Sequence, residues 1–113
     1  MSLTSKSPQD VAREALAAGT AALALYSHKF SPKTFTQPQL LACLVLKKFF
    51  RTDYRGIAAI IRDHSDLRQI LGLAKAPHFT TLQKASVRLL PQSRFRKLLG
   101  CTLRRVMRRK RVI

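Results

Sequence analysis

Apolar and polar residues follow one another along this chain with the period of an α-helix, in segments separated by Pro, Gly and short polar stretches. The pattern predicts helices over about residues 8–27, 37–50, 54–63, 66–71, 81–90 and 94–109. No segment shows the two-residue alternation of a β-strand, and there is no internal repeat. The sequence therefore predicts an all-α fold, a small bundle of about six helices that contains a helix-turn-helix-like unit of three helices.

Residues that favour helix N-termini precede these segments. Thr36 and Gln39 have the spacing of a capping box, and Thr80 and Gln83 predict a second one. The other predicted caps are Ser7, Asp53, Ser65 and Ser93, and Gly72 is expected to end the fourth helix. We expect a single domain over residues 1–113, with an N-terminal helix and linker (1–35), a core that holds the three-helix unit (36–92) and a basic C-terminal helix (93–113).

The second predicted helix is apolar almost all round from residue 40 to 46, which is typical of a helix at the centre of a bundle. The fifth is two-sided. Its apolar positions are Leu82, Ala85 and Leu89, and its polar positions are Thr81, Lys84 and Arg88. As the last helix of the three-helix unit it is predicted to be the recognition helix, although the connection before it is longer than the usual turn.

The polar side of this helix offers groups that suit DNA. The hydroxyls of Thr80 and Thr81, the first backbone N–H groups and the helix dipole suit a phosphate. Gln83, Lys84 and Arg88 can then reach base edges or further phosphates. A solvated polar face is the alternative interpretation, and the absence of any acidic residue nearby favours DNA.

The last helix carries the strongest charge. Its predicted apolar stripe is Phe95, Leu99, Thr102 and Val106. On the opposite side, within an arc of roughly 100°, lie Arg94, Lys97, Arg104, Arg105 and Arg108. No acid alternates with these residues, so we expect a phosphate backbone to neutralise them. A membrane-surface or calmodulin-binding helix is the alternative, and an apolar face with one aromatic residue and no Trp argues against a membrane anchor.

Charge over the whole chain supports a polyanionic partner. There are 22 Lys and Arg against 5 Asp and Glu, a formal net charge of +17, and residues 68–113 hold thirteen basic side chains and no acid. The longest apolar stretch, residues 40–46, is far shorter than the roughly 20 residues of a membrane span. Together with the lack of a signal peptide, this predicts no membrane association. Cys43 and Cys101 are expected to be unpaired buried thiols, with a structural disulfide as the alternative.

Nothing in the sequence indicates catalysis. Asp53 and Asp66 have roles at helix starts, and neither Ser65 nor Thr80 has a base and an orienting acid at a suggestive spacing. The three His and two Cys do not have zinc-site spacing. We therefore expect no catalytic residue, no metal and no cofactor. His78, in the loop before the fifth helix, can donate to a phosphate or be simply exposed.

Arg55 and Arg62, which share the polar face of the third helix, complete the set of candidate DNA contacts. The full set is Arg55, Arg62, His78, Thr80, Thr81, Gln83, Lys84, Arg88, Arg94, Lys97, Arg104, Arg105 and Arg108.

Six short segments follow one another in a characteristic order: YSHKF at 26–30, FTQPQL at 35–40, DYRG at 53–56, DLR at 66–68, LGL at 71–73 and PHFTTL at 77–82. In this order they resemble the N-terminal region of bacterial insertion-sequence transposases of the DDE type, over about 65 of the 113 residues. The resemblance implies a helical domain that binds double-stranded DNA at the terminal inverted repeats of a transposon. It also implies a bacterial cytoplasmic, nucleoid-associated protein that is normally fused to an RNase-H-like catalytic core.

In those transposases a basic stretch like residues 104–113 leads into the first strand of the core, which carries the first metal-binding aspartate. Here the sequence ends at Ile113. We therefore expect a transposase DNA-binding domain truncated before its catalytic core, or a regulator of transposition that occupies the inverted repeats. Self-association or pairing with full-length transposase remains open. The alternative is a basic nucleic-acid-binding or ribosome-associated protein without sequence preference.

Overall fold

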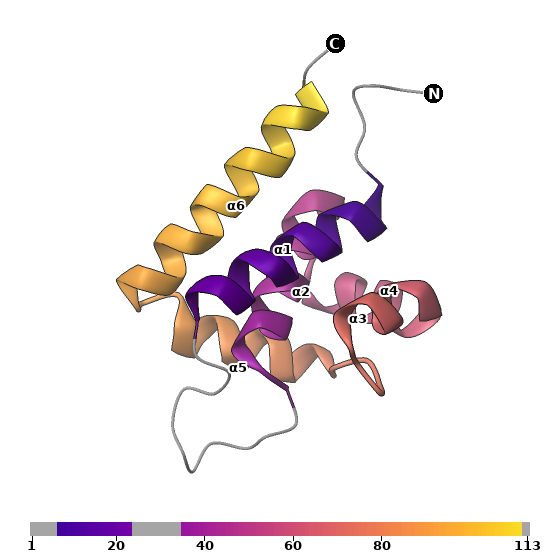
Figure 1. Ribbon diagram of the computed structural model, residues 1–113. Helices are drawn as coiled ribbons and strands as arrows, with labels where there is room; N and C mark the ends of the chain where they lie inside the picture. The colour runs from indigo at the N-terminus through magenta and orange to yellow at the C-terminus, as the bar shows by residue number, and fades with distance from the viewer. Residues whose placement is uncertain (1–6, 24–34, 112–113) are drawn as a thin grey trace.

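The computed structural model describes residues 7–23 and 35–111, and their side chains as far as residue 106. Its helices are α1 (Pro8–Ala22), α2 (Gln37–Phe50), α3 (Tyr54–Asp63), α4 (Ser65–Leu71), α5 (Phe79–Leu89) and α6 (Ser93–Arg111). The described segments contain no β-strand, so the predicted all-α bundle is confirmed. In Figure 1, α1 lies across α2, and α6 runs along the left side of this pair. Helix α5 lies below the pair, and α3 and α4 lie on the right, opposite α6.

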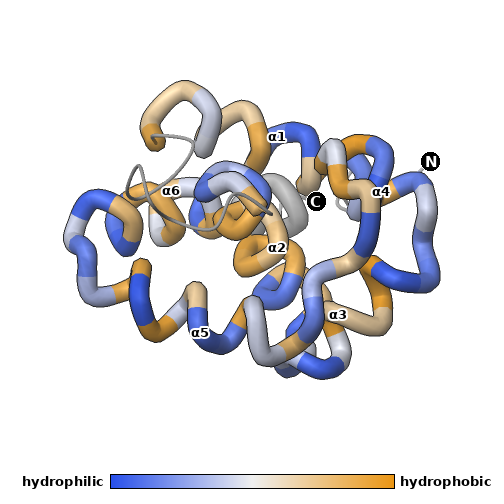
Figure 2. The backbone as a smooth tube through the Cα atoms, turned by 90° about the horizontal axis from the view of Figure 1, so that it is seen from below, coloured by the Kyte–Doolittle hydropathy of each residue, from blue (hydrophilic) through white to orange (hydrophobic). Residues whose placement is uncertain are grey.

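The centre of the bundle is α2. Every residue from Leu40 to Leu46 is buried, and the helix packs against α1, α3, α5 and α6. Figure 2 shows its apolar residues in the middle of the molecule. The predicted capping box fixes its start: Gln39 N–H donates to Thr36 Oγ1 at 3.2 Å, and Thr36 N–H donates to Gln39 Oε1 at 2.9 Å. An apolar helix in this position provides the buried surface on which the apolar sides of the surrounding helices pack.

The same glutamine also ties α2 to α4. Its Nε2 donates to Leu71 O at 3.0 Å and to Gly72 O at 3.2 Å. These carbonyls lie at the C-terminal end of α4, where no intrahelical N–H is left to satisfy them. Gly72 ends α4 as predicted, with the positive φ of 72° that glycine adopts without strain.

Three predicted N-caps are confirmed and three are wrong. Ser7 and Asp53 accept from the backbone at the starts of α1 and α3, as Thr36 does in α2. Ser65 is instead the first residue of α4, because one residue, His64, is all that separates α4 from α3. The ring of His64 does not cap α4 either, since its Nδ1 lies 2.7 Å from Ile60 O in α3.

At α5 the predicted capping box of Thr80 and Gln83 does not form. The cap is His78, which lies in extended backbone after Pro77, so the helix begins before Thr80. The last helix begins at Ser93 itself, and Arg96 N–H donates to Gln92 O at 3.0 Å across its first turn. In both cases the chain enters the helix earlier than the first residue that cap preferences favour.

Helix α1 ends at Ala22, earlier than the predicted end near residue 27. Leu23 has extended backbone (φ −117°, ψ 146°) and packs partly buried against the core. This packing outweighs the helix propensity of the Ala-rich sequence. The predicted linker over residues 28–35 lies, except for its last residue, outside the described residues.

The helices of the predicted three-helix unit are neighbours, since α3 packs against both α4 and α5. Helix α4 also packs against α1, and α5 against α2. The three-helix unit is thus part of the bundle, and the buried side of α5 packs against α2 and α3. Helix α6, which packs against α1 and α2, follows α5 after the short 90–92 turn.

Candidate nucleic-acid interface

The two sides of α5 lie as the sequence predicts. Leu82, Ala85 and Leu89 are buried, and Ser86 is buried with them. The side chains of Gln83, Lys84 and Arg88 are exposed, and Thr81 is half-buried at the margin. The helix therefore presents an amide and two cations to the outside while its apolar side is fixed in the core.

The N-terminal end of α5 differs from the prediction. Thr80 N–H, expected to be open to a phosphate, donates to His78 Nδ1 at 3.3 Å, and Thr80 Oγ1 lies 2.8 Å from the same nitrogen. Thr81 N–H donates to His78 O at 3.0 Å. His78 is exposed, but its Nδ1 serves the helix as a cap. Three of the groups that were expected to form a phosphate site here, the N–H and hydroxyl of Thr80 and the N–H of Thr81, are therefore engaged within the turn itself.

Helix α6 carries its predicted stripe inward. Phe95, Leu99, Thr102 and Val106 are all buried, and Thr102 Oγ1 donates to Leu98 O at 2.8 Å, which satisfies its hydroxyl in the core. The four cations of the opposite arc whose side chains are described are exposed: Arg94, Lys97, Arg104 and Arg105. The side chain of Arg108, the fifth, lies outside the described residues. We call the exposed cations of these two helices that the sequence predicts as DNA contacts the basic face: Lys84, Arg88, Arg94, Lys97, Arg104 and Arg105. Arg96 of α6 is exposed as well but lies outside the predicted arc.

One acidic side chain borders the basic face, which sequence spacing did not predict. Glu14 of α1 is mostly buried, and its Oε1 lies 3.8 Å from Arg105 Nε. A second polar contact involves Cys101, whose Sγ accepts from Arg104 Nη2 at 3.3 Å. Cys101 is exposed, which corrects the prediction of two buried thiols, whereas Cys43 is buried and both are free. The rest of the basic face has no carboxylate within ion-pair distance among the described side chains.

The two arginines predicted on α3 are exposed but separate from one another. Arg55 lies over the ring of Phe79 at 4.4 Å, which places its guanidinium beside the start of α5. Arg62 lies two turns further along α3 and pairs with Asp63 at 3.2 Å. Arg55 therefore extends the candidate surface at α5, while Arg62 is at the end of α3 that adjoins α4.

A residue that sequence reasoning did not single out, Arg68 of α4, has a structural role. Its Nη1 donates to Ile61 O at 2.8 Å and also contacts Arg62 O. These carbonyls are at the C-terminal end of α3, so the guanidinium caps that helix. Although Arg68 adds to the charge of the second half of the chain, it is not part of the basic face.

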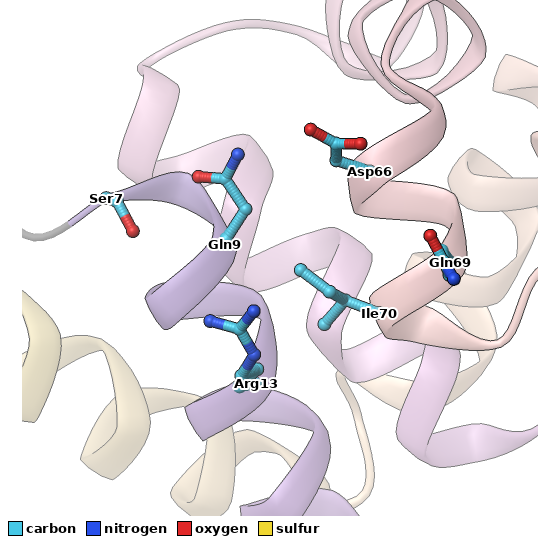
Figure 3. Close-up of a pocket in the computed structure, with 6 residues that line it drawn as sticks. All are labelled: Ser7, Gln9, Arg13, Asp66, Gln69 and Ile70. Atoms are coloured by element: carbon cyan, nitrogen blue, oxygen red, sulfur yellow. The ribbon is translucent and has the colours of Figure 1, made fainter.

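A pocket of about 630 Å³ lies elsewhere, between the first turns of α1 and α4 (Figure 3). It is lined by Ser7, Gln9, Arg13, Asp66, Gln69 and Ile70. In Figure 3, residues of α1 face those of α4 across the gap. Arg13 also pairs with Asp10 at 3.1 Å. With charges of both signs at its edge, this pocket is chemically unlike the basic face.

Within the described residues, no three His, Cys, Asp or Glu side chains are grouped so that they could hold a metal ion. No described helix is both long and apolar enough to cross a membrane. Comparison of the chain with protein-family models, with curated protein sequences and with solved structures finds no match.

Proposed function

We propose that this chain binds double-stranded DNA through the basic face, with α5 in the major groove and α6 along the phosphate backbone. The observation that carries the proposal is the exposure of the six cations of the basic face, on two helices joined by the short 90–92 turn, with one carboxylate, Glu14, beside them in the described residues. Like charges one helical turn apart, such as Lys84 and Arg88, repel one another, and the phosphates of a duplex neutralise them.

The dimensions of the two helices support this assignment of roles. An α-helix with its side chains is about 10–12 Å wide and fits a major groove about 12 Å wide. The 11 residues of α5 extend roughly 16 Å, enough to cross the groove. Helix α6 has 19 residues and extends roughly 28 Å, which suits contacts with successive phosphates.

The packing of α6 favours DNA over an anionic membrane surface. A helix that lies in a membrane interface buries its own apolar face among the lipids. In α6 that face, from Phe95 to Val106, is already buried against α1 and α2. The exposed side of α6 is mainly cationic, which suits contacts with phosphates.

The biological role follows from the resemblance of residues 26–90 to transposase N-terminal regions. We propose that the duplex is the terminal inverted repeat of a transposon and that the chain takes part in transposition or regulates it. In this role the chain binds DNA, and we assign no catalytic residue to it. The second candidate, a nucleic-acid-binding protein without sequence preference, is favoured by the same basic face and differs in lacking discrimination between sequences.

A salt titration with matched charge variants tests the proposal. If about 6 phosphates are contacted, the logarithm of the association constant for duplex should fall against the logarithm of salt concentration with a slope near −5. The double variant Lys97→Gln/Arg104→Gln should bind more weakly and lower the steepness of that slope by about 2. The control, Arg13→Gln/Lys48→Gln, removes the same charge from two exposed residues of α1 and α2 that belong neither to the basic face nor to the candidate DNA contacts.

The control should leave both affinity and slope close to those of the original chain. A slope flatter than about −2, or equal losses in the two double variants, would refute binding through the basic face. Selection of bound fragments from a random duplex library then separates the two candidates, because an enriched motif excludes binding without sequence preference.

A further inference from the structure

The outer side of α5 carries one apolar side chain among its polar ones. Val87 is 73% exposed, and it is the one large hydrophobic residue in the described part of the chain that is exposed. Its neighbours one turn earlier on the helix are Gln83 and Lys84, and Arg88 follows it. Val87 therefore lies in the middle of the face that the proposed function directs at DNA.

The fold does not require valine at this position. The residues of α5 that pack on the core are Leu82, Ala85, Ser86 and Leu89, and Val87 points away from them. A β-branched residue has a slightly lower helix propensity than Ala, Lys or Gln. A single exposed apolar residue is ordinary on a protein surface and by itself indicates no function. The position of Val87 between an amide and two cations of the proposed DNA-binding side of α5 is what indicates a role in binding.

We propose that Val87 contacts the 5-methyl group of a thymine in the major groove and so selects a T·A pair within the bound site. The methyl group of thymine is the one apolar group that base edges present in the major groove. Gln83, Lys84 and Arg88, on either side of Val87, carry donors for the polar atoms of neighbouring bases and for phosphates. This inference rests on the proposed function, because it needs α5 in the major groove.

The test removes the 5-methyl group from thymine and the two γ-methyl groups of Val87 from the protein. Each thymine of the selected duplex is replaced in turn by uracil, which pairs identically but lacks the 5-methyl group. Affinities for the original chain and for Val87→Ala are then measured by fluorescence anisotropy. At one position, uracil should weaken binding by the original chain about three- to fivefold, the effect expected for one buried methyl group, and should leave binding by Val87→Ala unchanged.

Two controls keep the result interpretable. Val87→Ala should be folded, since the side chain is exposed, and its helical circular dichroism verifies this. Lys84→Gln should weaken binding and yet retain the full uracil effect, because it leaves the apolar contact in place.

The outcomes separate this inference from the function on which it rests. Failure of the original chain to bind any duplex refutes the proposed function. Duplex binding with no enriched motif, or with a uracil effect of equal size in Val87→Ala, overturns the role of Val87 and leaves duplex binding intact. Loss of concentration-dependent self-association in Val87→Ala, with no change in DNA binding, would likewise overturn it and identify the residue as a contact between copies of this chain.

Discussion

Replacing Gly19 by Ala should destabilise the protein, although Ala is the better helix former. Gly19 is buried in α1, where that helix lies against the start of α2. A Cβ atom there would lie 2.9 Å from Pro38 Cα and 3.1 Å from Leu41 Cδ2. The first of these atoms belongs to the backbone of α2, so it moves only if the two helices separate.

The magnitude follows from two opposing effects. Gly to Ala in the interior of a helix stabilises by about 0.5–1 kcal/mol, because Gly loses more backbone entropy on folding. Inserting a methyl group into a packed contact costs about 1–3 kcal/mol. We therefore expect the free energy of unfolding of Gly19→Ala to be about 1–2 kcal/mol lower than that of the original chain.

Gly100→Ala in α6 is the matched control. A Cβ at Gly100 would meet one atom, Arg104 Nη1, at an ordinary contact distance of 3.6 Å. This variant should therefore gain about 0.5–1 kcal/mol from helix propensity alone. Urea unfolding of both variants at constant salt, monitored by the helical circular dichroism signal, measures the difference in their free energies of unfolding. A Gly19→Ala protein as stable as Gly100→Ala would refute close packing of α1 on α2.

Three further predictions concern single side chains. Arg68→Met, which keeps the aliphatic stem but loses the donors to Ile61 O and Arg62 O, should lower the free energy of unfolding by about 1–2 kcal/mol; unchanged urea midpoints would contradict this. Glu14→Gln removes the carboxylate 3.8 Å from Arg105, and it should raise affinity for duplex about twofold at low salt, with the gain disappearing as salt screens the charge; weaker binding would show that Glu14 instead positions α6. Burial raises the pKa of the Cys43 thiol to about 12, so a thiol reagent should modify one cysteine, the exposed Cys101, in the folded chain and both after unfolding. The Cys101→Ser variant should then show no reactive thiol until it unfolds, and rapid labelling of its Cys43 would indicate an open core.

Local rules account for the parts of the fold that were predicted. The capping box of Thr36 and Gln39 and the cap at Asp53 involve residues three apart. The apolar stripe of α6 is likewise set by helical period, so its burial could be foreseen from spacing alone. Such signals need no knowledge of which helices pack together.

The contacts that escaped prediction join residues that are distant in sequence, or break a preference. Gln39 reaches the end of α4, and Glu14 reaches Arg105 of α6, only because the bundle brings these helices together. His78 caps α5 in place of Thr80 because the chain at Pro77 and His78 is already extended, and histidine is not among the usual capping residues. The exposure of Cys101, by contrast, follows from the helical period, because Cys101 lies one turn from Lys97 and Arg105 on the side opposite the apolar stripe of α6.

The basic face alone does not distinguish the folded domain from any other cationic chain. An unfolded chain of this sequence carries the same charge of +17 and is also attracted to phosphates. Phosphate attraction therefore stabilises the folded state only by the difference between the two affinities. Discrimination between bases is another matter, because it requires Gln83, Lys84 and Val87 to be held on one side of a helix whose opposite side is fixed in the core. Selectivity for sequence, rather than affinity, is thus the property that this fold can add to its charge.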